Sequence, residues 1–178
     1  MRCFISLEVG EAVKRQSQSL ISLLKQMGFE AKWVEDENFH ITLFFLGVIL
    51  SDQLEKTAEM LKNFRIEPFR LSINKLGYFQ KHAKPTVIWL GLTKSEPLFQ
   101  LYSTMREQLE VIYPQPFSKK FNPHLTLGRI KRAPEDWKGI IKTTKVEIVE
   151  IGDIVLSLKS SILTETGPIY KTLEKTVR

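Results

Sequence analysis

Residues 39–47 read FHITLFFLG, and residues 122–130 read NPHLTLGRI. Each stretch holds a histidine, an apolar residue, a threonine and a leucine in that order, inside an apolar and β-prone run. Because side chains alternate along a strand, the histidine and the threonine of each phrase share one face, and the apolar residues share the other. Each phrase therefore predicts a strand with a core face and a face that carries an imidazole beside a hydroxyl.

Repetition strengthens a functional interpretation of this phrase. The chain has three histidines, and two of them, His40 and His124, stand in the same phrase 84 residues apart. One histidine on a strand is most often a hydrogen-bonded structural residue, whereas two in matching contexts indicate a shared task. If an approximate two-fold axis relates the two strands, both imidazoles face one cleft.

Two imidazoles and two hydroxyls around one cleft suit displacement at phosphorus. One imidazole takes the proton of the attacking water, and the other protonates the leaving oxygen on the opposite side. The hydroxyls of Thr42 and Thr126 hold the non-bridging oxygens as negative charge builds up. Imidazole pKa values near neutrality let a neutral base and a protonated acid coexist. The residues alone thus predict phosphodiester chemistry.

The sequence lacks the residues that a zinc site or a serine catalytic triad requires. A zinc site needs three or four ligands, typically closely spaced, and the single cysteine, Cys3, has no partner at such a spacing. A serine triad needs a nucleophile in a strand-to-helix elbow, which the sequence does not show. We therefore expect neither a metal nor another cofactor.

Composition limits the class of protein. Of 178 residues, 43% are hydrophobic and 26% are charged, which is typical of a globular protein with a buried core. The sequence has no run of about eighteen apolar residues and no leader with a cleavage site, so we expect no membrane partner. A single cysteine suits a reducing cytoplasm. The net charge of +6 favours a polyanionic partner that carries phosphates, and the lack of heptads favours a monomer.

Strand, helix and His phrase follow one another twice along the chain. Apolar residues at helical spacing predict helices over 13–27 and 98–112, and the pair Asp52 and Glu55 predicts the capped start of another. The segment with Trp33 is expected to be a loop. Further β-prone runs and one short helical run are FRLSINKLGYF (69–79), TVIWLGL (86–92), PEDWKGII (134–141), VEIVEIGDIVLSLKSS (146–161) and PIYKTLEKT (168–176).

This order predicts an α+β protein whose sheets are mainly antiparallel. We expect one bilobal domain over residues 1–178, with two lobes related by a pseudo-two-fold axis. Each lobe is a sheet with helices packed outside, and the active cleft lies between the lobes.

The two phrases, extended to HITLFFLG and FNPHLTLGRI, resemble the two-histidine phosphoesterase superfamily. Within it they look like the RNA 2′,3′-cyclic phosphodiesterases, also called the 2′-5′ RNA ligase family. The resemblance covers nearly the whole chain through RCFISLEV (2–9), Trp33, LGYF (76–79), VIWLGL (87–92) and GPIY (167–170). It implies the bilobal fold and hydrolysis of a 2′,3′-cyclic phosphate at an RNA end to a 2′-phosphomonoester.

The resemblance also implies roles for the residues of the two phrases. His40 would be the proton donor to the leaving 3′ oxygen. His124 would be the proton acceptor that activates water. Thr42 and Thr126 would hold phosphate oxygens.

Two more residues match family positions in substrate binding. Arg129 matches an arginine that contacts the phosphate, and Phe45 matches an aromatic residue on which the nucleobase stacks. Both follow their histidine by five residues, so strict alternation puts them on the wrong face. They reach the cleft if the strands bulge or end near Phe44 and Gly128.

One segment departs from the family pattern. SSILTETG at 160–167 replaces an Arg-Ser-Glu-Leu-like phrase, so no contact is carried over to it. Two other functions stay open beside the hydrolysis of RNA ends or cyclic nucleotides. One is a related enzyme for 2′-5′ linked oligonucleotides, an ADP-ribose cyclic phosphate or reversible 2′-5′ RNA ligation. The other is an RNA-end binding module without turnover, which would not need both His-Thr pairs together with Arg129.

Overall fold

The computed structural model describes residues 1–117, 120–164 and 168–176, which form an α+β fold. The strands in these ranges are β1 (Arg2–Glu8), β2 (Glu30–Trp33), β3 (His40–Val48), β4 (Ser72–Lys81), β5 (Lys84–Leu92), β6 (His124–Arg132), β7 (Val149–Glu150), β8 (Leu156–Leu163) and β9 (Pro168–Lys175). The helices are α1 (Glu11–Gln26), α2 (Ser51–Asn63), α3 (Glu96–Ile112) and α4 (Trp137–Thr143), with a 3₁₀ turn η1 (Asp36–Asn38).

All of these strands belong to one antiparallel sheet. Its order is β7-β4-β5-β6-β3-β1-β8-β9, and β2 pairs with β6. The order is symmetric about the β6–β3 junction, where Ile41 pairs with Leu125. On either side of the junction, β5 corresponds to β1 and β4 corresponds to β8. The expected α+β class and the two related halves are therefore confirmed, but the halves form one continuous sheet, joined where β3 pairs with β6.

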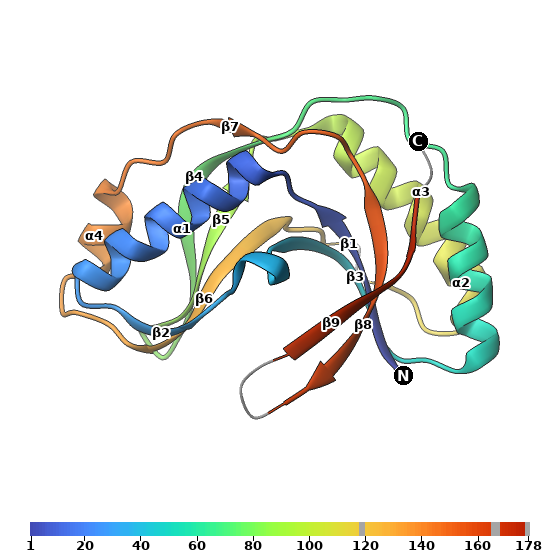
Figure 1. Cartoon of the computed structure of the whole chain (residues 1–178), viewed down its shortest axis with the longest axis horizontal. Helices are drawn as coiled ribbons and strands as arrows, with labels where there is room; N and C mark the ends of the chain where they lie inside the picture. Colours follow the sequence, from blue (N-terminus) through green and yellow to red (C-terminus); the bar gives the residue numbers. More distant parts are fainter. Residues whose placement is uncertain (118–119, 165–167, 177–178) are drawn as a thin grey trace.

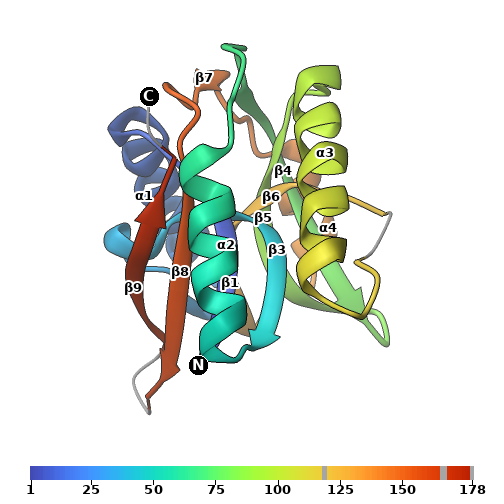
Figure 2. The ribbon, with the colours of Figure 1, turned by 90° about the vertical axis from the view of Figure 1, so that its right-hand side faces the viewer.

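The helices lie on the outer sides of the two halves. Figure 1 shows α1 and α4 beside β4–β6, and α2 and α3 beside β3, β1 and β8. Figure 2 shows α2 and α3 lying side by side, in agreement with their contact. The helix that follows β5 thus packs on the half built around β3, where Tyr102 of α3 stacks on Phe44 at 4.4 Å between ring centroids. The two halves are interleaved along the chain.

The core lies between the sheet and these helices. Ile41 and Leu125 are fully buried and belong to the same apolar cluster as Val13 of α1 and Met105 of α3. Because side chains alternate along a strand, the histidines are held on the opposite face of the sheet. We call the face with His40, Thr42, His124 and Thr126 the His face; its four residues are half-buried.

Several details differ from the sequence expectations. The capping pair Asp52 and Glu55 is wrong: α2 begins at Ser51, and the side-chain oxygen of Gln53 accepts from the N–H of Leu50 at 3.0 Å. The segment with Trp33 is the strand β2 and not a loop. The run 146–161 is two strands, because Gly152, with φ of 91°, turns the chain between β7 and β8.

Candidate active site

The register of β3 and β6 brings the two His phrases together. Ile41 lies opposite Leu125, so His40 and His124 flank this pair from its two sides, on the same face. The charge of His124 is also one of the smaller causes that lower the pKa of His40. The structure therefore places both histidines on one face of the sheet, at the junction of its two halves.

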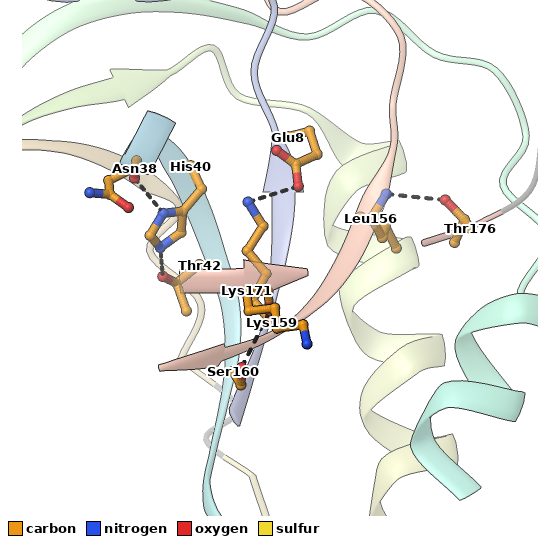
Figure 3. Close-up of polar contacts among 9 residues, drawn as sticks. All are labelled: Glu8, Asn38, His40, Thr42, Leu156, Lys159, Ser160, Lys171 and Thr176. Atoms are coloured by element: carbon orange, nitrogen blue, oxygen red, sulfur yellow. Dashed lines mark hydrogen bonds and ion pairs between the residues drawn. The ribbon is translucent and has the colours of Figure 1, made fainter. Parts of the chain in front are cut away.

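The two imidazoles are held in the same way. The Nδ1 atom of His40 lies 2.7 Å from the carbonyl oxygen of Asn38, and Nδ1 of His124 lies 2.8 Å from that of Asn122. A carbonyl oxygen only accepts, so Nδ1–H is the donor in both rings. In the neutral rings the lone pair is then on Nε2. In His40 this atom accepts from the hydroxyl of Thr42 at 3.1 Å (Figure 3).

Aromatic rings flank each imidazole. The ring of His40 lies 4.9 Å from Phe4 and 5.2 Å from Tyr170, which meets it edge-on at 90°. His124 has Phe79 at 5.0 Å and Trp89 at 5.9 Å between ring centroids. These rings pack against each imidazole and restrict where it can turn. The sequence analysis gave none of the four a role, although each lies in a stretch that carried the family resemblance.

His40 resists protonation in the free protein. Burial is the largest cause that lowers its pKa to about 4, and the charges of Lys159 and His124 act in the same direction. The Asn38 carbonyl and the Glu8 carboxylate act against this shift but are weaker than burial. His40 is therefore neutral near pH 7 when no ligand is bound.

A bulge turns Phe45 toward the His face. Along β3, Leu43 is an extra residue relative to β1, so Phe45 comes to lie opposite Phe4, whose ring also contacts His40. The ring centroids of Phe4 and Phe45 are 6.5 Å apart. Phe45 is 77% exposed, which leaves its ring available for stacking.

An equivalent bulge turns Arg129 to the same face. Leu127 is the extra residue of β6 relative to β5, and Arg129 lies opposite Val87, which shares a face with Trp89. The positive charge of Arg129 partly offsets the burial that raises the pKa of Tyr170, so its guanidinium lies near that hydroxyl. Phe45 and Arg129 each needed a bulge in its strand to reach the His face, and the structure has one in both strands.

Two other features of the sequence, His82 and the segment 160–167, are not part of this site as the structure describes it. His82 is exposed in the β4–β5 turn, where its φ is 48°. Of the segment 160–167, residues 160–163 belong to β8, and 165–167 lie outside the described residues. Within the described part of the chain, no group of three or more His, Cys, Asp or Glu side chains is placed to hold a metal ion. In the same part, no helix has both the length and the apolar character of a membrane span.

Known proteins share this sequence pattern. A family model described as LigT like Phosphoesterase matches residues 7–89. An RNA 2′,3′-cyclic phosphodiesterase of Thermotoga maritima is 39% identical over 97% of this chain and 93% of its own length. The chain belongs to the LigT-like phosphoesterase family. The relative of the same name from Archaeoglobus fulgidus is 33% identical to this LigT-like phosphoesterase, over 97% of this chain and 98% of the relative.

Solved structures show the same fold as this LigT-like phosphoesterase. A Thermus thermophilus protein of known crystal structure is 27% identical to this chain in sequence and superimposes on it with a TM-score of 0.78. The match covers 98% of this chain and 96% of the Thermus thermophilus chain. The apo form of E. coli LigT is 19% identical with a TM-score of 0.74, over 99% of this chain and 98% of LigT. The fold of this chain is therefore also that of these two solved structures.

Proposed function

We propose that this chain hydrolyses the 2′,3′-cyclic phosphate at an RNA end and leaves a 2′-phosphomonoester. The observation that carries the proposal is the placement of two imidazoles, each anchored through Nδ1, on either side of the Ile41–Leu125 pair. The substrate class is supported by the relatives named RNA 2′,3′-cyclic phosphodiesterase. In this proposal the 178 residues act as one catalytic domain and as a monomer, because one chain supplies both imidazoles, and the protein works in the cytoplasm, which suits a chain with a single cysteine.

The chemistry is a displacement at phosphorus with two proton transfers. Nε2 of His124 takes a proton from water as the water oxygen forms a bond to phosphorus. The bond from phosphorus to the 3′ oxygen breaks on the opposite side, and Nε2 of His40 gives that oxygen its proton. The phosphate stays on the 2′ oxygen. Proton exchange with solvent returns both imidazoles to their starting states.

Hydroxyl and guanidinium groups stabilise the charge on phosphate. Thr42 and Thr126 share the His face with the imidazoles and can donate to the non-bridging oxygens. Arg129 adds a positive charge and a planar set of donors suited to phosphate. Phe45 offers an exposed ring for the base of the terminal nucleotide. No metal takes part in this proposal.

Substrate binding has to charge His40 before it can act as an acid. The free protein keeps this imidazole neutral near pH 7, with a pKa of about 4. A bound phosphate anion beside Nε2 favours the imidazolium and raises that pKa. The proton of the general acid is therefore taken up together with the anionic substrate.

The decisive experiment is a product assay on an RNA with a 2′,3′-cyclic end. His40→Ala and His124→Ala should each lower kcat by roughly 10²–10⁴-fold, because each removes one proton transfer. His82→Ala is the matched control and should keep full activity, since His82 lies in an exposed turn. The wild-type product should carry a 2′-phosphate. Full activity in either site variant, or a 3′-phosphate product, contradicts the assigned roles.

A second assay tests the metal-free proposal. Activity should be unchanged after dialysis against EDTA. Loss of activity that zinc or magnesium restores would overturn this part of the mechanism. The same preparation should be offered 2′-5′ linked oligonucleotides and an ADP-ribose cyclic phosphate; faster turnover of either would move the substrate class to that compound.

A further inference from the structure

The two histidines occupy equivalent strand positions but have different neighbours. Glu8 of β1 lies directly opposite His40. The equivalent position on β5, opposite His124, is Gly91. A Cβ atom on Gly91 would lie 2.5 Å from the side chain of Lys75, so no larger residue fits there without displacing it. A carboxylate therefore faces His40 from the neighbouring strand, and none faces His124 from the equivalent position.

A lysine holds this carboxylate. The ammonium of Lys159, on β8, lies 2.9 Å from a carboxylate oxygen of Glu8, and its side chain is only 7% exposed. Lys159 lies opposite Phe4 on β1, and the Phe4 ring contacts His40. Figure 3 shows the Lys159 side chain extending toward Glu8, on the side of β1 where His40 lies. The ion pair is thus part of the surroundings of the imidazole.

Burying such a pair is costly for the fold. The desolvation of two charges offsets most of their attraction, so a buried ion pair is weak support for a purely stabilising role. Glu8 and Lys159 instead act on His40 with opposite signs, because the carboxylate raises the pKa of the imidazole and the ammonium lowers it. His124, from β6, adds a charge that also lowers it. The Tyr170 ring, from β9, lies edge-on against His40, with the charge of Arg129 near its hydroxyl.

We propose that Glu8 and Lys159 act as one positioning pair that adjusts the charge state of the buried His40, a control that His124 lacks because Gly91 stands at the equivalent position. Lys159 forms an ion pair with the carboxylate of Glu8. Without Lys159, that carboxylate would pair with the His40 imidazolium. Burial of the imidazole, together with this ion pair, keeps His40 neutral until an anionic phosphate arrives. The catalytic meaning of the pair rests on the proposed function, whereas its effect on His40 does not.

An NMR titration of the histidine rings in the free protein tests the pair. Lys159→Gln leaves the Glu8 carboxylate alone beside His40 and should move the His40 titration to higher pH, by on the order of one unit. Glu8→Gln leaves the ammonium alone and should move it to lower pH. The double variant should lie between the two. Lys171→Gln removes the same charge from an exposed position on β9 and should leave the titration of His40 unchanged.

Loss of one partner can also destabilise the protein, so the exchanged pair is included. Glu8→Lys combined with Lys159→Glu keeps both charges and places the cation directly opposite His40. The His40 titration should then fall below that of the wild type. Shifts of the same sign in both single variants, or an unchanged titration in the exchanged pair, would show that the pair acts only through packing.

Kinetics connect the titrations to catalysis. The acidic limb of kcat/KM reports groups of the free enzyme, so it should move in the same direction as the His40 titration in each variant. Opposite titration shifts in a protein without turnover would uphold the pair and refute the proposed function. If the protein turns over the cyclic phosphate but the acidic limb of kcat/KM lies at the same pH in Lys159→Gln and Glu8→Gln, the proposed function is upheld and the role of the pair is refuted.

Discussion

Phe45 and Arg129 occupy equivalent places on the His face. Each follows its histidine by five residues, and each is turned to that face by one extra residue, Leu43 or Leu127, in its strand. The same bulge in the same place gives β3 and β6 the same sequence of buried and exposed positions. The symmetry that pairs the histidines thus places an aromatic ring at one side of the site and a cation at the other.

Replacement of Phe45 by alanine should weaken the binding of RNA ends without destabilising the fold. The ring is 77% exposed, so its removal leaves no cavity. Stacking of one base on an aromatic ring is worth about 1–3 kcal/mol, which corresponds to a KM higher by roughly 5- to 150-fold. Val111→Ala, at an 88% exposed apolar position on α3, is the matched control and should have the KM of the wild type. An unchanged KM in Phe45→Ala would remove this ring from the site.

Replacement of Arg129 by methionine should reduce kcat/KM for the cyclic phosphate by roughly 10- to 100-fold, the value of a hydrogen bond to a charged group. Lysine at this position should restore only part of the activity, because it lacks the planar fork of donors. Arg132→Met is the control, since Arg132 is exposed and paired with Glu30 at 3.5 Å. Steady-state kinetics at two salt concentrations separate this contact from long-range attraction. Equal losses in the Arg129 and Arg132 variants would mean that only net charge matters.

Tyr170 should act through its ring. It meets the His40 imidazole edge-on, with 5.2 Å between centroids. Tyr170→Phe keeps that ring and should retain kcat, whereas Tyr170→Ala opens one side of the imidazole to water and should lower kcat. The extra water should also raise the pKa of His40, because burial is the main cause that lowers it. A loss of kcat in Tyr170→Phe as large as in Tyr170→Ala would assign the role to the hydroxyl.

The sequence predicted those parts of the site that depend on local pattern. The period of two in the His phrases placed His40 and Thr42 on one face, and the helical spacing of apolar residues located α1 and α3. Alternation alone put Phe45 and Arg129 on the wrong face, because a bulge depends on the register with the neighbouring strands.

The rest of the site depends on the order of strands in the sheet. Glu8 and Lys159 are 151 positions apart and meet only because β8 pairs with β1. The strand β2 has only four residues and none of them is buried, so its alternation was too short to predict a strand around Trp33. The spacing of apolar residues along the sequence does not show which strands pair in the sheet, so these contacts could not be predicted from it.

The lowered pKa of His40 also predicts how stability depends on pH. An unfolded histidine titrates near pH 6.5, whereas His40 in the folded protein has a pKa of about 4. Between these values the unfolded chain binds a proton that the folded protein does not, so acid favours unfolding. This contribution to stability is complete above pH 6.5, is lost as pH falls toward 4, and amounts to at most about 3 kcal/mol.

Urea unfolding of His40→Asn at pH 7.5 and 4.5 measures this contribution. The wild type should lose more stability between the two pH values than His40→Asn, because asparagine does not titrate. His82→Asn is the control: it removes an exposed histidine from a turn with positive φ, which asparagine tolerates, and should keep the pH dependence of the wild type. Carboxylates distant from His40 titrate alike in all three proteins, and the neighbouring Glu8 keeps its ion pair with Lys159, so the difference between the proteins reports mainly on His40. Equal losses in the wild type and His40→Asn would mean that the imidazole is solvated and charged in the folded protein, and that its acid form does not require the substrate.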